Sequence, residues 1–523
     1  MEAGIDQTNI EEGTNQGANQ IEEEQTTIAS NSLFGFMRSG SKFIVAFLLS
    51  ILFVRLLGAQ NYGVYSILTM YWSLAAGLSA FGLNSSLLYG IARYRAKNER
   101  KSLRWIVEHN LILLIISSLV ASVGLYAAAA PLSVIYHTPE IAPLLRILAI
   151  GIVVFNLSES FENQVYIGYQ KMKYSFVTGV LFDMLRLAQL AVVYLGFGLL
   201  GAITFYDVIY LVVASVGGFF VYRLVKKEPS REKPNVEEIK HIRKYRNFSY
   251  ASSLVSLFYG PLIVFILGAV APNLTFVSFY RVGLIMAGLI GVPAAAIGSA
   301  FFSSITKHLE HKEFDVFYTL QKKLLKYSAL ITFPLVFGSI FSAKDLVAYL
   351  YKTAFAGAEI PFIIMLIPVL IAGLFGPMPS ILSATGRQKY YMYSTIIGAV
   401  LGLSLSVLVI PYMLSVGAAV VYAIVSLSML GSNLFFLSKF IKIKLPYIDF
   451  LKGLLAAGVM SAFLYFVLPR VQLHFLPAVL ILGLLVYTGM LYITKTINNH
   501  EIGFIVKLAK ADKLFKLFSR KKE

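Results

Sequence analysis

The chain has no cysteine, only two tryptophans in 523 residues, and a charged fraction of just 14%. The lack of cysteine excludes disulfide bonds, thiolate metal sites and cysteine nucleophiles. The histidines do not cluster at metal-ligand spacing, and the closest pair is His308 and His311 in a basic stretch. Neither a Walker-type phosphate loop nor a Gly-rich dinucleotide loop is present. We therefore expect no metal site, no cofactor and no ATP-driven chemistry in this chain.

Long apolar runs make up most of the chain. Hydrophobic residues account for 57% of the composition and the mean hydropathy is +0.73, which is typical of a surface that faces lipid. A helix needs about 20 apolar residues to cross a hydrocarbon core of about 30 Å. Aliphatic runs with internal glycine and proline predict membrane helices rather than barrel strands. Fourteen runs qualify: 34–57, 62–90, 105–130, 141–167, 174–195, 197–222, 248–271, 275–303, 326–350, 360–384, 390–412, 415–437, 447–468 and 475–496.

The basic residues alternate from one connection to the next. Seven connections hold 36 of the 45 Lys and Arg residues, and the seven short connections between them hold only Lys352 and Arg470. Since Lys and Arg collect in cytoplasmic loops, this pattern predicts that both termini are cytoplasmic. It also accounts for much of the net charge of +18, so no nucleic-acid partner is needed.

The two ends of the chain differ in composition. Residues 1–30 carry seven acidic residues and no basic one, which predicts a disordered cytoplasmic tail. No signal-peptide pattern precedes the first apolar run, so we expect that run to be retained as a span. Residues 498–523 alternate phenylalanine, leucine and lysine at helical spacing, which predicts a basic amphipathic helix on an anionic inner leaflet.

Two short segments recur in the second half of the chain. Gly168-Tyr169-Gln170-Lys171 is echoed by Gly386-Arg387-Gln388-Lys389, and Leu57-Gly58-Ala59 is echoed by Leu267-Gly268-Ala269. Related halves are common in transporters, with the substrate site between them. The repeat predicts a six-helix lobe at 31–226, a basic linker at 227–246, a second six-helix lobe at 247–444, and two further helices at 445–497.

Several of these motifs resemble the polysaccharide transporter branch of the multidrug, oligosaccharidyl-lipid and polysaccharide exporter superfamily. They are Arg55-Leu56-Leu57-Gly58, Tyr62-Gly63-Val64-Tyr65, Phe81-Gly82-Leu83 and the two Gly-x-Gln-Lys connections. The resemblance implies an O-antigen-type flippase in a prokaryotic plasma membrane, which moves a polyprenyl-diphosphate-linked oligosaccharide outward. The two lobes would rock about a central cavity. It also implies membrane lipids and glycan-assembly enzymes as partners, and function as a monomer.

A lipid diphosphate carries about two negative charges, and these are costly to desolvate unless cations receive them. Basic residues inside spans are rare and usually face a partner or water. Arg281 lies two turns into the run 275–303, where related flippases carry a cavity arginine. It is our first candidate for substrate binding, and the alternative is an arginine bonded to a neighbouring helix.

Three further cations lie in the first run. Arg38 and Lys42 are four residues apart, so they share one helix face and would form the cytoplasmic rim of a diphosphate path. Alternatively, they extend to the membrane surface and reinforce the orientation. Arg55 lies at the outer end of the same run, and its place in the Arg-Leu-Leu-Gly turn favours a structural role.

Acidic residues inside spans are candidates for coupling transport to H⁺ or Na⁺. Asp183 and Arg186 are three residues apart in the run 174–195, which predicts an ion pair on one helix face. This pair either lowers the cost of both charges in the membrane or releases Arg186 to phosphate when Asp183 binds an ion. Glu159, Glu162 and Asp207 complete the acidic set of the first lobe.

Two other classes of function compete with a flippase. A cation-coupled drug or metabolite exporter of the same superfamily would favour an acidic cavity, whereas the basic residues in the spans favour an anionic substrate. A polytopic glycan polymerase or transferase would need a large external loop, and no predicted outer loop exceeds about 15 residues. A non-transporting membrane protein is the remaining alternative.

Overall fold

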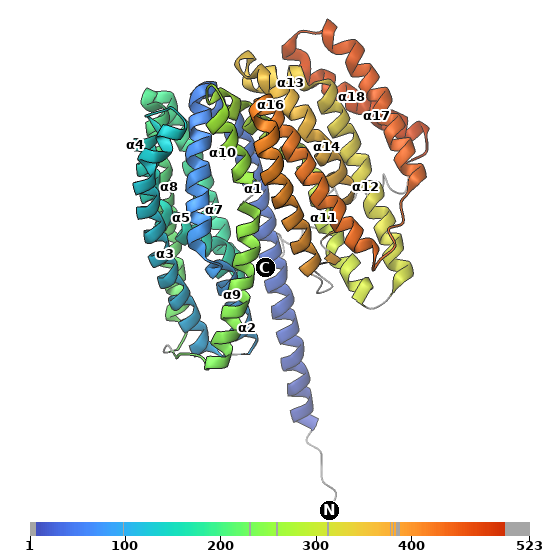
Figure 1. The fold of residues 1–523 in the computed structure, drawn as a ribbon. Coiled ribbons are helices and arrows are strands. Elements are labelled where there is room, and N and C mark those ends of the chain that lie inside the picture. The colour runs from blue at the N-terminus through green and yellow to red at the C-terminus, as the bar shows by residue number, and fades with distance from the viewer. Residues whose placement is uncertain are drawn as a thin grey trace, which may run out of the picture. The chain divides into compact units, whose positions relative to one another are not determined.

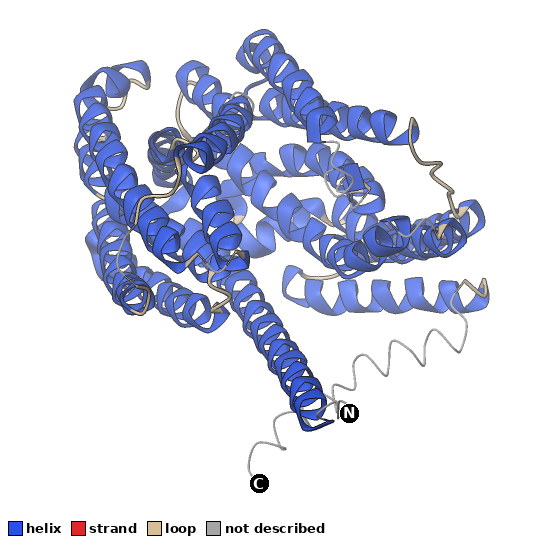
Figure 2. Ribbon diagram, turned by 90° about the horizontal axis from the view of Figure 1, so that it is seen from below, coloured by secondary structure: helices blue, strands red, loops and turns tan. Residues whose placement is uncertain are grey.

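In the computed structural model, the described residues form helices, turns and loops and contain no strand (Figures 1 and 2). The description covers residues 7–97, 99–229, 232–257, 260–310, 313–376, 378–379, 381–382 and 388–496. The predicted amphipathic helix at 498–523 and the Gly386-Arg387 part of the repeat lie outside these residues. The described part of the chain is thus all-helical, and the protein is a multi-pass membrane protein.

Internal contacts divide the chain between Thr275 and Phe276 into two units. The helices of the first unit are α1 (Gln7–Ala80), α2 (Leu83–Ala96), α3 (Arg100–Ile135), α4 (Ile141–Ile150), α5 (Ile152–Ser160), η1 (Phe161–Val165), α6 (Tyr166–Gly168), α7 (Met172–Val192), η2 (Val193–Phe197), α8 (Gly198–Lys226), α9 (Val236–Leu257) and α10 (Gly260–Val270). Both η1 and η2 are π-helices. Within this unit α9 packs on α2 and α10 packs on α1.

The second unit contains the remaining helices. These are α11 (Thr275–Glu310), α12 (Phe314–Phe341), α13 (Ala343–Tyr351), η3 (Thr353–Ala358), α14 (Glu359–Phe375), α16 (Gln388–Ser438), α17 (Tyr447–Val467), η4 (Leu468–Arg470), η5 (Leu473–Phe475) and α18 (Leu476–Ile493). The last two long helices pack on each other and on α12, around a core that includes Phe333, Met460 and Tyr487.

The first helix begins at Gln7, so residues 7–30 are helical and not the irregular tail that their composition predicts. In Figure 1 this part of α1 extends away from the other helices of its unit. Glutamate, glutamine and alanine are good helix formers, and a single helix needs no buried core to satisfy its own backbone hydrogen bonds. Low hydrophobicity therefore excludes a packed domain here but does not exclude a helix.

Two of the long helical stretches in the first unit fold back on themselves. In α1 the chain reverses at Gly58, whose φ of 74° suits glycine, and the rings of Phe53 and Tyr65 have centroids 4.9 Å apart. A straight helix would separate residues twelve apart by about 18 Å. The stretch from α7 to α8 reverses at η2, where Gly196 has a φ of 95°.

In the second unit α16 reverses at Leu414, whose φ is 48°. Gly398 precedes this reversal and Met429 follows it, yet the two are close in space. A Cβ added to Gly398 would lie 2.6 Å from the Met429 side chain. Two antiparallel segments therefore make up this 51-residue helix.

Nine described helices are long and apolar enough to cross a membrane, or ten if the bent pair formed by α4 and residues 152–168 counts as one span. The sequence predicts fourteen. The numbers differ mainly because α1, the α7–α8 stretch and α16 are each counted once although each covers two predicted runs. In addition, α10 has only 11 residues.

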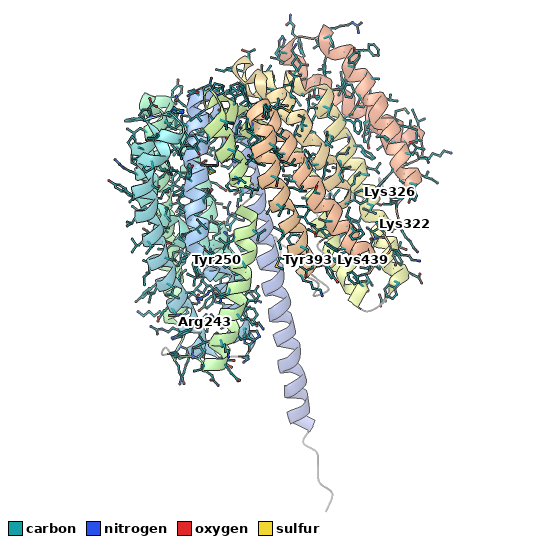
Figure 3. All side chains as sticks on the ribbon, in the orientation of Figure 1. Arg243, Tyr250, Lys322, Lys326, Tyr393 and Lys439 are labelled. Carbon is teal, nitrogen blue, oxygen red and sulfur yellow. The ribbon has the colours of Figure 1, made fainter. Side chains whose placement is uncertain are left out.

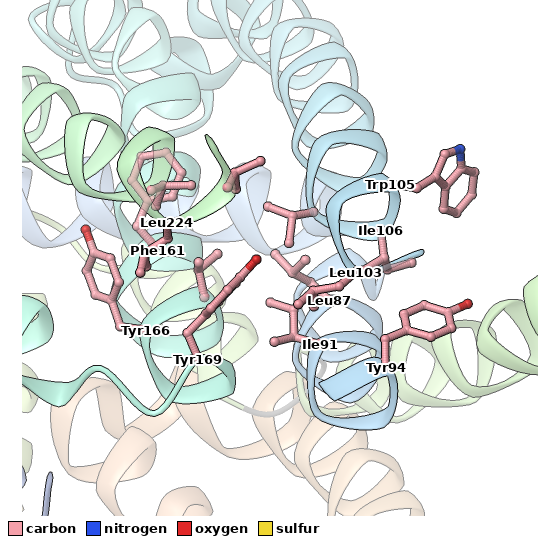
Figure 4. Close-up of a cluster of buried hydrophobic side chains, with 14 of the residues drawn as sticks. Leu87, Ile91, Tyr94, Leu103, Trp105, Ile106, Phe161, Tyr166, Tyr169 and Leu224 are labelled. Atoms are coloured by element: carbon pink, nitrogen blue, oxygen red, sulfur yellow. The ribbon is translucent and has the colours of Figure 1, made fainter. Parts of the chain in front are cut away.

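A compact cluster of buried apolar side chains lies within the first unit (Figure 4). It joins side chains of α2, α3, α8, α9 and the segment around η1, including Ile91, Ile106, Phe161 and Leu224. These contacts hold α9 against α2 and α3, and they position the polar groups that surround the cluster.

Candidate functional site

Arg38 on α1 joins two carboxylates from other helices inside the first unit. Its Nε donates to Glu162 Oε1 at 2.8 Å, and its Nη1 donates to Asp183 Oδ2 at 2.9 Å. Both Arg38 and Asp183 are buried, with 8% and 6% of their surface exposed. Glu162 is partly buried. The shared cation lowers the cost of placing both carboxylates in this environment, although the three groups together keep one negative charge.

Ser41 completes this network, because its hydroxyl donates to Asp183 Oδ2 at 2.7 Å. It lies three residues after Arg38, so both donors point from one face of α1 toward α7. One oxygen of Asp183 therefore accepts two hydrogen bonds from α1. We call Arg38, Ser41, Glu162 and Asp183 the Arg38 network.

The close approach of α1 to α7 depends on Gly179. A Cβ at this position would lie 1.8 Å from Arg38 Nε and 2.4 Å from Arg38 Cζ. Gly179 precedes Asp183 by one helical turn, so the guanidinium passes directly over the α7 backbone to reach the carboxylate. Any larger residue would displace it.

Glu162 lies in η1, a single π-helical turn between α5 and α6. Such turns often mark functional sites, because the inserted residue changes the direction of the side chains that follow. Glu159, one turn earlier, accepts a hydrogen bond from Asn163 Nδ2 at 2.8 Å. Its carboxylate also interacts electrostatically with Arg38, with Glu162 and with the exposed Lys42. Three carboxylates and two cations thus lie close together around one part of α1. The sequence predicts that this part is the cytoplasmic half of the span.

The predicted ion pair between Asp183 and Arg186 is wrong. Asp183 binds Arg38, whereas the Arg186 guanidinium turns further along α7 and donates to Gln189 Oε1. It lies 4.7 Å from the ring centroid of Tyr206 and 5.8 Å from that of Phe53. Residues three apart share a helix face, but a short aspartate directed toward α1 does not meet an arginine directed toward aromatic rings. No carboxylate of the described residues forms an ion pair with Arg186.

Asp207 on α8 lies outside the Arg38 network. Its Oδ1 is buried and has no hydrogen-bond partner among the described residues. The same oxygen faces the break between α4 and α5, where a Cβ on Gly151 would lie 2.0 Å away. Asp207 is therefore a partly buried carboxylate with one enclosed oxygen, and it forms no ion pair within the described part of the chain.

Arg281 and Arg55 complete the predicted set. Arg281 lies on α11 in the second unit, and its Nε is buried without a hydrogen-bond partner in the described part of the chain. Arg55 is half-buried, three residues before the reversal at Gly58, and is engaged in an interaction there. Arg281 thus retains a free donor, and the place of Arg55 suits a structural role.

Three contributors to these sites are not evident from sequence reasoning. Ser41 has no charge, but its spacing from Arg38 is a usable signal. Gly179 lies one helical turn before Asp183, and a glycine at this spacing from a carboxylate in an apolar run indicates a close helix contact. Nothing in the local sequence identifies Gln189 as the acceptor for Arg186, because its role depends on how the Asp183 side chain turns.

Chemically, the Arg38 network presents carboxylate oxygens, which are the protein groups that bind protons and small hard cations. It holds two carboxylates against one guanidinium, and Glu159 beside it adds a third carboxylate. Binding of H⁺ or Na⁺ at Asp183 or Glu162 would weaken the hold on Arg38, because that hold depends on the negative charge.

Three comparisons with known proteins bear on this site and fold. Residues 28–307, more than half of the chain, match the family described as "Polysaccharide biosynthesis protein". The "Probable low-salt glycan biosynthesis flippase Agl15" of Haloferax volcanii is 23% identical over 306 residues, which cover 57% of this chain and 64% of that relative. The match thus spans less than two thirds of the relative's length.

Two solved structures have a similar fold. The lipid II flippase MurJ in an inward closed conformation superimposes with a TM-score of 0.69 at 15% identity, over 88% of this chain and 98% of that one. A multidrug resistance MATE family transporter of the MOP superfamily, in an inward-facing conformation, superimposes with a TM-score of 0.61 at 16% identity, over 80% and 95% of the two chains. At this level of identity the likeness establishes the fold alone.

Proposed function

The chain belongs to the polysaccharide biosynthesis protein family, and on that basis we propose that it is a flippase of the MOP superfamily for a lipid-linked glycan. Its substrate would be a polyprenyl-diphosphate-linked oligosaccharide, carried from the cytoplasmic to the outer leaflet by alternating access. The similarity to a glycan biosynthesis flippase and to the lipid II flippase fold supports this class of substrate. We infer action as a monomer among membrane lipids and glycan-assembly enzymes.

One observation carries this proposal: two guanidinium groups in apolar helices have no carboxylate partner in the described structure. Arg186 is held by an amide oxygen and aromatic rings, and Arg281 retains a buried, unpartnered Nε. A charged group at mid-bilayer costs about 2.5 to 3.5 kcal/mol, so an uncompensated arginine needs an anion to receive it. A diphosphate supplies such an anion and accepts paired N–H donors from guanidinium groups.

The Arg38 network supports coupling to an ion gradient. In the proposed cycle, H⁺ or Na⁺ neutralises Asp183 or Glu162, and Arg38 loses part of its attachment. The freed guanidinium then contributes to the diphosphate path, with Lys42 at its rim. Glu159 and Asp207 are further carboxylates that take part if more than one ion is bound.

We also propose the orientation of the chain in the membrane. The chain would cross the plasma membrane of a prokaryote fourteen times. An even number of spans leaves both termini on the same side, which would be the cytoplasmic side. The lobes at 31–226 and 247–444 would move as two bodies, joined through 227–246 and followed by two helices at 445–497. The alternation of basic and non-basic connections supports this arrangement.

The proposal is tested by Arg186→Ala and Arg281→Ala in cells that depend on the protein for glycan export. We expect both variants to reach the membrane in normal amount and to export at least about tenfold less glycan, since each removes charge-assisted hydrogen bonds worth about 1.5 to 3 kcal/mol. Arg470→Ala is a matched control, because Arg470 is exposed and bonded to a backbone oxygen of its own segment. Normal export by both variants would refute the assignment of these residues to substrate binding.

A second candidate function is a cation-coupled exporter of drugs or metabolites. The concentration of carboxylates around α1, with Glu159, Glu162 and Asp183 in one region, favours this alternative. Uptake of a cationic dye into inside-out vesicles distinguishes the two. A dye exporter would retain its transport in Arg186→Ala, whereas a flippase would show no dye transport at all.

A further inference from the structure

The basic helix α9 packs on α2 and on the break between α1 and α2. The ring of Tyr250 stacks on Phe81 with centroids 4.4 Å apart, and Tyr245 stacks on Tyr89 at 4.5 Å. In the turn between α1 and α2, a Cβ on Gly82 would lie 2.4 Å from the Arg246 carbonyl oxygen. Arg243 and Tyr250 mark this helix in Figure 3. The basic side chains of α9 therefore lie at defined positions.

A small pocket of about 40 Å³ lies between α2, α3 and α9. This is room for roughly three water-sized groups. Its polar lining comes from Ser86, His109, Asn110, Arg243 and Arg246, and its apolar lining includes Trp105 and Ile106 of the cluster in Figure 4. The pocket thus combines several donors with a partly apolar wall.

The charge in this pocket is positive and uncompensated. No described carboxylate lines it. Arg243 makes no ion pair or hydrogen bond with the described residues, and Arg246 makes only long contacts of 3.3 and 3.4 Å with Asn247 Oδ1. Burial, and then the neighbouring Arg243, lower the pKa of the Arg246 guanidinium. The two cations are three residues apart on α9, where like charges repel each other.

Most of the acidic residues nearby are paired with other cations. A larger cleft of about 1120 Å³ shares Arg243 with the pocket and contains four glutamates. Of these, Glu238 forms ion pairs with Arg93 and Lys97, and Glu232 forms one with Lys101. The cleft is therefore lined by five Lys and Arg residues and four carboxylates, whereas no described carboxylate lines the pocket beside it.

We propose that the pocket between α2, α3 and α9 binds a phosphate oxyanion through Arg243 and Arg246, as presented by the headgroup of an anionic phospholipid or as free phosphate. Two guanidinium groups suit the oxygens of a phosphate, and the hydroxyl and amide of Ser86 and Asn110 provide neutral polar groups beside them. In α9 the charged stretch ends near Arg246 and apolar residues begin shortly afterwards, which is the composition found at the depth of lipid phosphates. The proposal does not depend on the assignment of the chain as a flippase.

The test compares Arg243→Gln/Arg246→Gln with Lys240→Gln/Lys244→Gln, which removes the same charge from the cleft side of α9. Native mass spectrometry measures the binding of dioctanoyl phosphatidylglycerol, with dioctanoyl phosphatidylcholine as the zwitterionic lipid. We expect phosphatidylglycerol to bind the arginine variant at least about tenfold more weakly, since two charge-assisted contacts are lost. The lysine variant should bind within about twofold of the natural protein, because neither Lys240 nor Lys244 lines the pocket. Equal affinity in the natural protein and the arginine variant, or equal binding of the two lipids, would overturn the proposal.

Inorganic phosphate identifies the source of the ligand. Displacement of phosphatidylglycerol by phosphate shows that the free anion is sufficient, and persistence of lipid binding shows that the acyl-linked headgroup is required; either result upholds the phosphate chemistry.

If the arginine variant does not fold, the natural protein still provides a test. Phosphatidylglycerol, but not phosphatidylcholine, should protect Arg243 and Arg246 from phenylglyoxal, while the exposed Arg223 on α8 remains reactive. Absence of such protection would refute the site.

Discussion

The backbone of Gly179 on α7 lies directly against the side chain of Arg38 on α1. A Cβ at Gly179 would lie 1.8 Å from Arg38 Nε, so the guanidinium rests directly on the α7 backbone. Only this close contact allows the same guanidinium to reach Glu162 and Asp183 together. The absence of a side chain at one position thus determines the ion pairing of three charged residues.

Replacement of Gly179 by alanine should therefore displace Arg38 and break the network. Breaking a buried ion pair costs about 3 to 5 kcal/mol, which exceeds the gain of about 1 kcal/mol that alanine brings to a helix. Thermal unfolding of the purified protein should shift to a clearly lower temperature. Gly124→Ala on α3 is the matched control, because a Cβ there meets nothing within 4 Å, and it should be neutral or slightly stabilising. The same unfolding temperature in both variants would contradict this account of Gly179.

Arg38, and not Arg186, should be energetically coupled to Asp183. A double-mutant cycle with Arg38→Met and Asp183→Asn should give a coupling energy of at least about 1 kcal/mol, because the two side chains form a buried ion pair. The cycle with Arg186→Met and Asp183→Asn should give a value near zero. Denaturant unfolding in a single detergent provides all the free energies of unfolding. A larger coupling for Arg186 would restore the pairing that the spacing along α7 predicts.

The same carboxylate should decide whether transport responds to an ion gradient. In proteoliposomes that contain the natural protein, we expect glycan-lipid transport to fall when the H⁺ and Na⁺ gradients are collapsed. Asp183→Asn keeps the shape of the side chain but cannot exchange an ion, so its transport rate should be unaffected by either gradient. Ser41→Ala removes one hydrogen bond and leaves the charge, and its transport should still respond to the gradients. Transport by the natural protein that persists after collapse would remove Asp183 from ion coupling.

The orientation can be measured because the chain contains no cysteine. Asn235→Cys lies at the start of α9 and Asn273→Cys lies in the connection between α10 and α11. In intact cells a membrane-impermeant maleimide should label residue 273 and should label residue 235 only after permeabilisation. Labelling of residue 235 in intact cells would overturn the proposed topology.

Composition and periodicity predict the helices well, and they also locate several reversals. Gly58, in a short loop between two apolar runs, adopts the left-handed conformation that its place in that loop suggests. Local patterns do not predict partners across helices. Arg38 and Asp183 are 145 residues apart, and spacing along α7 indicates Arg186 instead. Helical spacing identifies which residues share a face, whereas the choice of partner depends on how closely two helices approach, which Gly179 determines.

Asp207 provides a test of whether a buried carboxylate without a partner serves stability. Its Oδ1 has no hydrogen-bond partner among the described residues, so Asp207→Asn should leave the unfolding temperature unchanged or raise it, with a gain of up to about 1 kcal/mol from removing a desolvated acid. Gly151→Ala should have the opposite effect. Its methyl group would lie 2.0 Å from that oxygen, and overpacking of this kind costs about 1 to 3 kcal/mol. If Asp207→Asn were as destabilising as Gly151→Ala, the carboxylate would have to be ionised and bound, which would make Asp207 an ion-binding residue. If only Gly151→Ala is destabilising, the close contact between α8 and the α4–α5 break is a matter of packing, and the function of Asp207 must be sought in transport assays.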